Sequence, residues 1–574
     1  MGEGSLEKLL QKKSGSFLCA TGITLIYFAL LYLWRRPLLA LNDDMMLESI
    51  FSGAFLEAYP YSYYVSAELG GFLSGLYRII PAVPWLGLFY TFGAMFCVGA
   101  VLAQILGETE YTAIKRFGFA LLALTGVSAL YFRWFFLMHY TVLAALYGAA
   151  GLYLFVKAGK SRNYCLPIVM FLFSYLIREN VFFMLCPFIL AAAVFLLLED
   201  KGRRVKKDLI SGICFVTLFC VLFLINRLSM NSAQWKDYLS YNETRTNVYD
   251  YLGVMTDEEA YDYYRDQNVS KEEIEIIASY NLALLQEENG GYDALTAVEN
   301  LGKERKNSQN PGLFALFKVY VHRFLLQKED APWNWFAVAM YALLALVCIG
   351  SKNLLMFLPL GLLGVFRSIL WMILLERGRY PERVTLSLYL LEIAVLLGLF
   401  SELMKGFEIK NKALKYMGLG ILMLFFAATS IVAVQKTSRE YAGNEAVNRV
   451  DDQLYEYMRE HPENFYFLEV YSTVYRTKEA WRSEGGSRNN GQNYVWMGGW
   501  MIRHPLYLKK LDGLLSGAQN AMDILLEKEN AFLVMKEGAG LSASQMEEVL
   551  GQKLRLELEL PAGEEKFAFY KIDK

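Results

Sequence analysis

The chain has 574 residues, of which 55% are hydrophobic and 20% charged, and its mean hydropathy is +0.26. Soluble globular chains average about 45–50% apolar and about 25% charged residues, so the composition favours a membrane protein. The formal net charge of −2 argues against a nucleic-acid partner, because the phosphate backbone is bound by basic surfaces.

Eleven segments of the sequence are candidates for membrane-spanning helices, each of which needs about 20 mainly apolar residues. They cover 17–34, 84–106, 117–134, 139–157, 164–177, 181–198, 209–226, 333–350, 353–375, 384–404 and 416–434. The chain is therefore expected to be an α-helical polytopic membrane protein that ends in a small extracytoplasmic α/β domain. Its expected parts are an N-terminal transmembrane core (1–228) with an acidic first outer loop (35–83), an extracytoplasmic region with an interfacial helix (229–332), C-terminal transmembrane helices (333–435) and the α/β domain (436–574).

Basic residues in the short loops predict the orientation, because they concentrate on the cytoplasmic side. With a cytoplasmic N-terminus, the inner loops carry Lys115, Arg116, Lys157, Lys160, Arg162, Lys201, Arg203, Arg204, Lys206, Lys207, Lys405, Lys410, Lys412 and Lys415. Arg35 and Arg36 are exceptions, because they lie in a predicted outer loop. The larger number of basic residues in the inner loops still predicts that 229–332 and 436–574 face outward from the cytoplasmic membrane.

Several elements are expected in the polar parts of the chain. Amphipathic patterns predict helices over 67–80, 272–287 and 311–327, of which the first and last are suited to the membrane surface. In the tail, β-rich runs at 464–470, 531–535, 554–560 and 567–572 alternate with helical segments near 443–460, 516–528 and 542–551. This alternation predicts a layered sheet-and-helix domain.

Two adjacent carboxylates follow the first predicted span. Asp43 and Asp44 would repel each other and lose hydration at the membrane edge, unless a cation, a substrate hydroxyl or an arginine offsets that cost. Glu48 lies one helical turn beyond Asp44. The alternative is that Asn42, Asp43 and Asp44 cap a short helix over 45–55. The sequence carries no P-loop, dinucleotide fingerprint, paired-histidine zinc motif or nucleophile elbow.

Three arginines lie in a predicted outer turn, where the positive-inside tendency should exclude them. Arg377, Arg379 and Arg383 predict phosphate recognition, because the guanidinium fork matches phosphate oxygens. The alternative is pairing with Glu376 and Glu382, or contact with lipid headgroups. Further candidates for the same substrate-binding site are Arg133, His139, Arg178, Glu179, Arg245 and Glu48, although Arg133, His139, Arg178 and Glu179 could each be a helix-end anchor.

The order of first span, acidic pair, surface helices, many spans and outward tail resembles the GT-C superfamily of membrane glycosyltransferases. The stretches Asn42-Asp43-Asp44…Tyr59-Pro60, Tyr241-Asn242-Glu243-Thr244-Arg245 and Arg379-Tyr380-Pro381-Glu382-Arg383 are also similar to a group of polytopic membrane proteins from Firmicutes. The GT-C resemblance implies transfer of a sugar from a polyprenyl-phosphate-linked donor to a cell-envelope glycan or glycolipid acceptor. It also implies that Asp43 or Asp44 acts as the catalytic carboxylate, and it leaves the need for a divalent metal open.

Two other classes of function remain alternatives. A transporter or flippase for lipid-linked saccharides would share the spans and the arginines, and it would be expected to place ionisable residues and paired discontinuous helices within the membrane. Few charges lie deep in the predicted spans, with Arg367 and Glu392 as the exceptions, and the acidic pair favours the enzyme. A non-catalytic scaffold would need neither aspartate. Within the tail, Trp496, Trp500 and Tyr507 could stack on sugar rings or simply pack at an interface.

Overall fold

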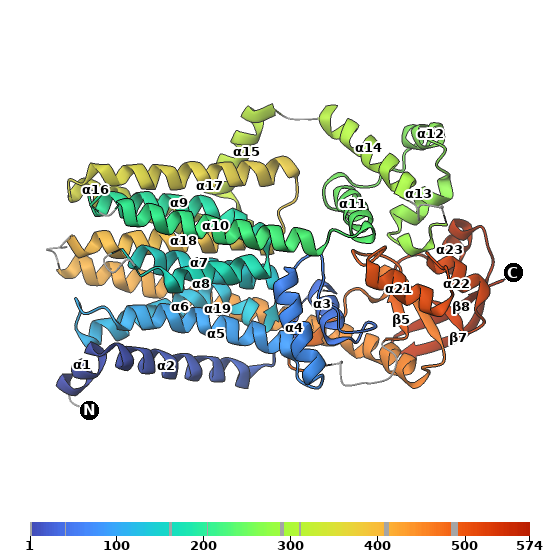
Figure 1. The fold of residues 1–574 in the computed structure, drawn as a ribbon, viewed down its shortest axis with the longest axis horizontal. Coiled ribbons are helices and arrows are strands. Elements are labelled where there is room, and N and C mark those ends of the chain that lie inside the picture. Colours follow the sequence, from blue (N-terminus) through green and yellow to red (C-terminus); the bar gives the residue numbers. More distant parts are fainter. Residues whose placement is uncertain are drawn as a thin grey trace.

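The helices that could cross a membrane form one bundle. The computed structural model describes residues 3–40, 42–159, 163–203, 205–286, 292–308, 312–406, 412–483 and 492–573. In these ranges ten helices are long and apolar enough to span a bilayer, as expected for a multi-pass membrane protein. They are α2 (Lys13–Trp34), α5 (Trp85–Leu106), α6 (Ala113–Phe136), α7 (Tyr140–Lys157), α9 (Glu179–Glu199), α10 (Val205–Ser229), α16 (Trp333–Gly350), α17 (Phe357–Arg377), α18 (Glu382–Leu403) and part of α19 (Lys412–Glu460). Figure 1 shows them running side by side along the long axis.

The remaining predicted crossing is α8 (Cys165–Ile177), which has only 13 residues. At 1.5 Å per residue it is about 20 Å long, less than the roughly 30 Å of a hydrocarbon core. It nevertheless carries the chain from one end of the bundle to the other. Lys157, before α8, pairs with Glu402 at one end, whereas Arg178, after α8, stacks on Tyr64 at the other.

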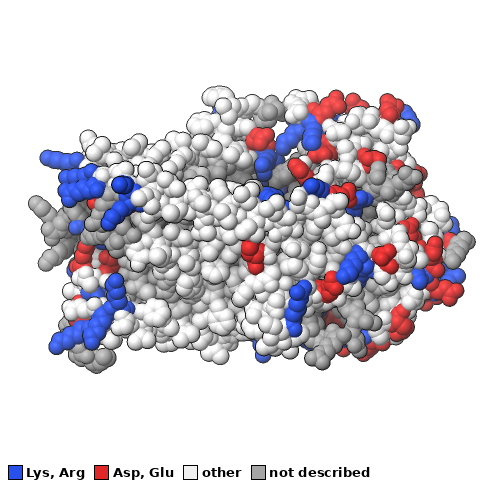
Figure 2. Space-filling view, viewed as in Figure 1, with Lys and Arg blue, Asp and Glu red and all other residues white. Residues whose placement is uncertain are grey.

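The middle of the bundle surface is apolar. On the face shown in Figure 2, charged side chains gather toward the two ends of the molecule and are sparse between them. Apolar side chains such as Leu25, Ile213 and Val216 project from the outer helices and are more than half exposed. A bilayer tolerates such a surface and disfavours charge there. Of the basic residues used to predict orientation, Lys160, Arg162, Arg204 and Lys410 lie outside the described residues, as do the side chains of Lys412 and Lys415.

Which end of the bundle faces the cytoplasm stays a prediction from the basic loops. We expect reporter fusions after residue 205 to give a cytoplasmic signal, and fusions after residues 260 and 500 to give an extracytoplasmic one. The measurement is a paired alkaline phosphatase and fluorescent-protein assay in whole cells. An extracytoplasmic signal after residue 205 would reverse the orientation.

The polar segment between the spans α10 and α16 folds into short helices, most of which lie at the end of the bundle where the tail is, whereas the last α-helix before α16 lies over α17 (Figure 1). The helices are α11 (Ala233–Asn247), η1 (Val248–Leu252), α12 (Glu258–Asp266), α13 (Lys271–Ala278), η2 (Leu282–Leu284), α14 (Tyr292–Ser308), α15 (Gly312–Leu326) and η3 (Lys328–Asp330). The structure thus has the apolar helix predicted over 311–327, as α15.

The helix predicted over 272–287 is shorter than expected. It is α13, which ends at Ala278, and Tyr280 then takes a left-handed backbone conformation with a φ of 63°. Such a residue terminates a helix. Asn281 turns toward the tail, where its Nδ2 donates to Glu469 at 3.2 Å. A contact with a distant segment therefore ends this helix, and Glu287 lies outside the described residues.

The tail is a small α/β unit, as predicted. Helix α19 runs without a break through residues 435 and 436 and leads into a five-stranded sheet of order β5-β3-β6-β8-β7. The strands are β3 (Phe465–Leu468), β5 (Tyr494–Trp496), β6 (Ala531–Lys536), β7 (Leu554–Ala562) and β8 (Glu565–Ile572), and the helices are α20 (Val470–Thr473), α21 (Pro505–Leu514), α22 (Ala521–Glu527) and α23 (Ala543–Leu550). Strand β3 pairs in parallel with β5 and β6, whereas β8 pairs antiparallel with β6 and β7. The sequence missed only the short β5 among these strands.

Three short strands from distant parts of the chain join the tail to the bundle. Strand β1 (Leu38–Leu39) pairs in parallel with β2 (Leu137–Met138) and antiparallel with β4 (Lys478–Glu479). The first loop then continues into α3 (Asn42–Ser52) and α4 (Ala67–Ile79), while α1 (Glu3–Gln11) lies at the opposite end. The three-stranded sheet therefore sets the start of α3, where the acidic pair lies, against both α7 and the tail.

Candidate functional site

The acidic pair lies inside α3 rather than before it. The helix begins at Asn42, so Asp43 and Asp44 occupy its first turn, and the helix expected over 45–55 starts three residues earlier. The carboxylate of Asp44 accepts from the hydroxyl of Tyr90 at 2.9 Å and from the backbone N–H of Tyr140 at 3.0 Å. Asp44 therefore binds the first turn of α7 instead of capping its own helix.

The two aspartates differ in how far they are buried. The side chain of Asp44 is fully buried, and this loss of hydration raises its pKa to about 8, although its hydrogen bonds oppose the rise. A carboxyl with that pKa is mostly protonated at neutral pH. Asp43 is only half-buried, so it is the member of the pair that a ligand can reach.

Three guanidinium groups surround Asp43. Burial raises the pKa of Asp43, and the charges of Arg383, Arg178 and Arg245 act against that rise, as does a hydrogen bond donated by the indole of Trp500. These arginines come from α18, from the break between α8 and α9, and from α11. A single carboxylate thus lies among more positive charges than it can neutralise, which suits an additional anionic group.

The arginines are held by neighbours that leave their charge available. Arg245 donates to Asn242 at 2.7 Å and to the hydroxyl of Tyr280 at 2.6 Å. Arg178 lies over the ring of Tyr64, with 4.8 Å between guanidinium carbon and ring centroid, and over Tyr140 at 5.5 Å. Cation–π contacts orient an arginine without neutralising it.

The two arginines of the α17–α18 turn differ. Arg379 forms an ion pair with Asp250. Its pKa is lowered by burial and then by the charge of Arg383, which places the two guanidinium groups close together. Within the described part of the chain, no carboxylate lies at ion-pair distance from Arg383. Of these two, Arg383 is therefore the guanidinium that is more open to a bound anion.

His139 lies close to Arg383 and Arg178. Its Nδ1 accepts from the backbone N–H of Thr141 at 3.0 Å, so the histidine caps α7. Burial lowers its pKa well below the ordinary value, and the charges of Arg383 and Arg178 lower it further. A neutral histidine in this position supports α7 rather than adding charge to the site.

Four of the predicted substrate-binding residues have other partners. Glu48 is buried and pairs with Lys478 of the tail at 2.5 Å. Arg133 pairs with Glu382 at 2.7 Å and with Glu440 at 2.5 Å. Glu179 pairs with Arg227 at 2.9 Å, and Arg377 lies 5.8 Å from the ring of Tyr251. The structure does not bring these four side chains to Asp43, whereas it does bring Arg178, Arg245, Arg379 and Arg383.

Aromatic side chains form the rest of the site, and sequence reasoning recognised few of them. Tyr64 stacks on Tyr140 at 5.4 Å between ring centroids and meets Trp500 edge-on at 5.1 Å. The tyrosine-rich run after residue 58 is the only sequence signal for Tyr64. Such faces bind the apolar sides of sugar rings and orient cations.

The tail contributes directly to the site through Trp500. Its backbone carbonyl accepts from the hydroxyl of Tyr238 at 2.8 Å, which fixes it against α11. The two other tail aromatics considered for sugar stacking lie elsewhere: the indole of Trp496 donates to Thr473 at 3.0 Å, and Tyr507 is buried. Only Trp500 of these three contacts the acidic pair.

Replacing Trp500 with phenylalanine should keep the ring against Tyr64 and remove the N–H that Asp43 accepts. A hydrogen bond to a charged group contributes about 1.5–3 kcal/mol, so we expect the pKa of Asp43 to rise by about one unit or more. The measurement is the pH–rate profile of the activity proposed below, whose acidic limb should move upward by that amount. Trp496→Phe is the matched control, and an equal movement in both variants would contradict a specific role for Trp500.

No ligand set for a metal emerges from the protein side chains. Among the described residues, His, Cys, Asp and Glu side chains form no group of three or more that could hold a metal ion. The arrangement that the structure does present is a carboxylate among guanidinium groups and aromatic rings. Comparison with protein-family models, curated proteins and solved structures finds no match for the chain.

Proposed function

We propose that the protein is a membrane glycosyltransferase that moves a sugar from a polyprenyl-phosphate-linked donor to an extracytoplasmic cell-envelope acceptor. The observation that supports this most is the convergence of Arg178, Arg245 and Arg383 on the half-buried Asp43. The guanidinium groups suit the phosphate of the donor. The carboxylate suits an acceptor hydroxyl, which is a weak nucleophile until a base takes its proton.

The proposed reaction divides these roles. The acceptor oxygen forms a bond to the anomeric carbon of the sugar while its proton passes to Asp43. The bond between that carbon and the phosphate oxygen breaks, and the polyprenyl phosphate leaves with the electron pair. Negative charge grows on the leaving phosphate, where Arg383 and its neighbours stabilise it. Asp44 stays neutral, so it adds no second negative charge beside the phosphate.

The position of the site fits a lipid-linked donor. Asp43 lies just beyond the end of α2, and Arg383 lies in the first turn of α18, so both are close to the ends of apolar spans. A donor could keep its chain in the bilayer while its phosphate reaches the arginines. The tail and the helices of the 229–308 segment would then hold the acceptor.

A transporter of lipid-linked saccharides remains the rival, because charged residues lie within the spans. Arg367 and Glu392 are both buried and pair with each other at 2.7 Å. Fixed mutual pairs of this kind serve the stability of the bundle and do not by themselves bind a passing substrate.

Purified full-length protein in liposomes, given a polyprenyl-phosphate sugar and cell-envelope extract, separates these two functions. Transfer predicts that polyprenyl phosphate is released and that the sugar appears on an acceptor. Transport predicts that the intact lipid-linked sugar changes leaflets with its glycosidic bond unbroken. The second result would overturn the proposed function.

A further inference from the structure

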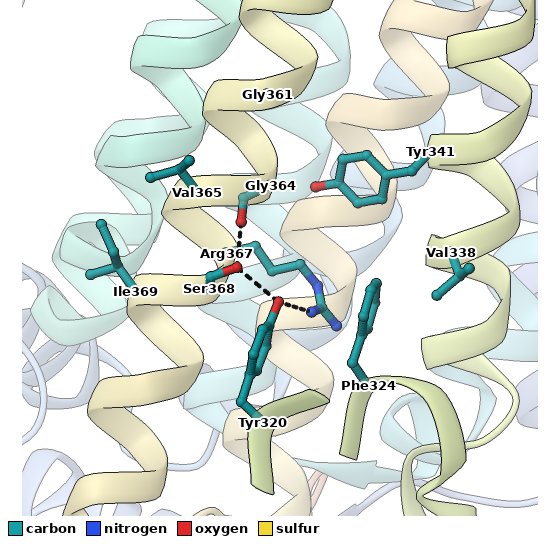
Figure 3. Close-up of a pocket in the computed structure, with 10 residues that line it drawn as sticks. All are labelled: Tyr320, Phe324, Val338, Tyr341, Gly361, Gly364, Val365, Arg367, Ser368 and Ile369. Atoms are coloured by element: carbon teal, nitrogen blue, oxygen red, sulfur yellow. Dashed lines mark hydrogen bonds between the residues drawn. The ribbon is translucent and has the colours of Figure 1, made fainter. Parts of the chain in front are cut away.

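A groove opens on the side of the bundle, between α15, α16 and α17. Figure 3 shows Tyr320 and Phe324 reaching into it from α15, opposite α17. Its volume is about 510 Å³, within the range of about 300–1,000 Å³ that is usual for ligand sites. Val365 and Ile369 at its rim are about half exposed, so the groove is open toward the lipid side.

One wall of the groove is made of glycine. A Cβ added at Gly361 or Gly364 would meet no neighbouring side chain or segment within 4 Å, although both residues lie inside α17. Glycine lowers helix stability by about 1 kcal/mol relative to alanine, and neither position needs it for close helix packing. The open space beside α17 is therefore a feature of the sequence and not a gap that larger neighbours fill.

The charged side chains at the floor of the groove neutralise each other. Arg367 is paired with Glu392 at 2.7 Å, donates to the hydroxyl of Tyr320 at 2.8 Å, and lies 3.6 Å from the ring centroid of Phe324. An anionic headgroup would have to compete with Glu392 for the guanidinium. The surroundings instead suit an uncharged chain that lies across aromatic and small residues.

Two elements, α17 and α15, extend from the groove to the α17–α18 turn, which carries Arg377 and Arg379. Arg377 follows Arg367 by ten residues on the same helix, which corresponds to about 15 Å along its axis. On α15, Arg323 pairs with Asp330 at 2.7 Å and lies 4.2 Å from the ring of Tyr380, within the turn itself. A ligand with its anionic end at the turn and a hydrocarbon chain of that length could occupy both places.

We propose that the groove holds the isoprenoid chain of the donor whose phosphate is bound by the arginines near Asp43. This inference rests on the proposed function, because that function supplies the donor. The chain lies along α17 beneath α15, and the Tyr320–Arg367–Glu392 contacts keep the groove open. Binding of the chain fixes the direction from which the phosphate enters the site.

Leucine at Gly364 or Gly361 tests this, since each side chain would project into the open groove. The matched control is Gly212→Leu on α10, where an added Cβ also meets nothing within 4 Å. Binding is measured with full-length protein in phospholipid nanodiscs for two probes, a long-chain polyprenyl phosphate and a prenyl phosphate with one isoprene unit. We expect the groove variants to bind the long probe about tenfold more weakly and the short probe as the wild type does.

The outcomes separate the groove from the function. Unchanged affinity for the long probe in both groove variants, or an equal loss for both probes, would overturn the groove assignment and leave the proposed function standing. If the wild type binds neither probe, the proposed function fails. A photoreactive group on the distal chain gives a second readout on unmodified protein: labelling of α15–α17 supports the proposal, whereas labelling confined to other helices, or labelling of α15–α17 by a photoreactive phospholipid instead, contradicts it.

Discussion

Sugar transfer should fall about 10²–10⁴-fold when Asp43 is replaced by asparagine, the range typical of removing a general base. Asparagine has nearly the same size and can still accept the indole hydrogen bond from Trp500, but it cannot take a proton. Removing the negative charge also leaves the arginines free, so binding of polyprenyl phosphate should be retained or strengthened. The measurements are the transfer rate at saturating donor and the affinity for the donor in the same preparation.

Asp44→Asn is the matched control, because the two aspartates are adjacent and the proposed mechanism assigns the role of base to Asp43 alone. An asparagine oxygen can accept from Tyr90 and from the N–H of Tyr140, as the protonated carboxyl does. We expect transfer within a fewfold of the wild type. Full activity in Asp43→Asn, with the rate lost instead in Asp44→Asn, would exchange the two roles; full activity in both would remove the main argument for an enzyme.

The stability of Asp44→Asn should also depend on pH differently from that of the wild type. The pKa of Asp44 is raised to about 8 in the folded protein by burial, whereas an unfolded aspartate has a pKa of about 3.9. Between these two values the folded state binds a proton that the unfolded state has released, so stability falls as pH rises through the window. Asp44→Asn should flatten this decline between about pH 4 and 8, as measured by thermal unfolding in detergent.

Replacing Arg383 with alanine is expected to lower the transfer rate about 10²–10³-fold, as removal of a single group that stabilises a developing anion does elsewhere. The reason is that Arg383 has no carboxylate at ion-pair distance among the described residues, while its charge acts on Asp43. Arg383→Lys keeps the charge and loses the planar fork, so it should recover only part of the rate. The measurement is kcat/KM for the lipid-linked donor.

Arg379→Ala provides the comparison within the same turn. Because Arg379 is already paired with Asp250, its loss should affect transfer less than the loss of Arg383. Added guanidinium ion should restore part of the activity of Arg383→Ala and none of that of Asp43→Asn. Equal rates in Arg383→Ala and the wild type, with both folded, would exclude Arg383 from phosphate binding.

Local sequence patterns predicted most of the fold. Apolar length predicted the spans, since about 20 residues are needed whatever their neighbours are, and alternation of strands and helices predicted the tail. Helix α13 was predicted too long because its end is decided by Asn281 and Glu469, which are 188 residues apart. A pattern within one segment carries no information about such a partner.

The sequence identified several side chains that the structure brings together near Asp43, but it did not predict how each of them is buried or paired. Arginines at the ends of spans are unusual enough to be noticed singly, and three of them, Arg178, Arg379 and Arg383, do act on Asp43. Glu48 was grouped with them because it lies one turn from Asp44, yet its partner, Lys478, is 430 residues away. The different burial of Asp43 and Asp44 likewise depends on α7 and the tail, which sequence spacing does not place.

The three-stranded sheet has a consequence for biosynthesis. Strand β4 and Trp500 come from the last hundred residues, whereas β1 comes from the first forty. The ribosome therefore synthesises these partners at widely separated times. A nascent or truncated chain would insert all its spans and still lack both the strand that seats α3 and the indole beside Asp43. The nascent chain is therefore expected to lack the proposed activity until its synthesis is nearly complete.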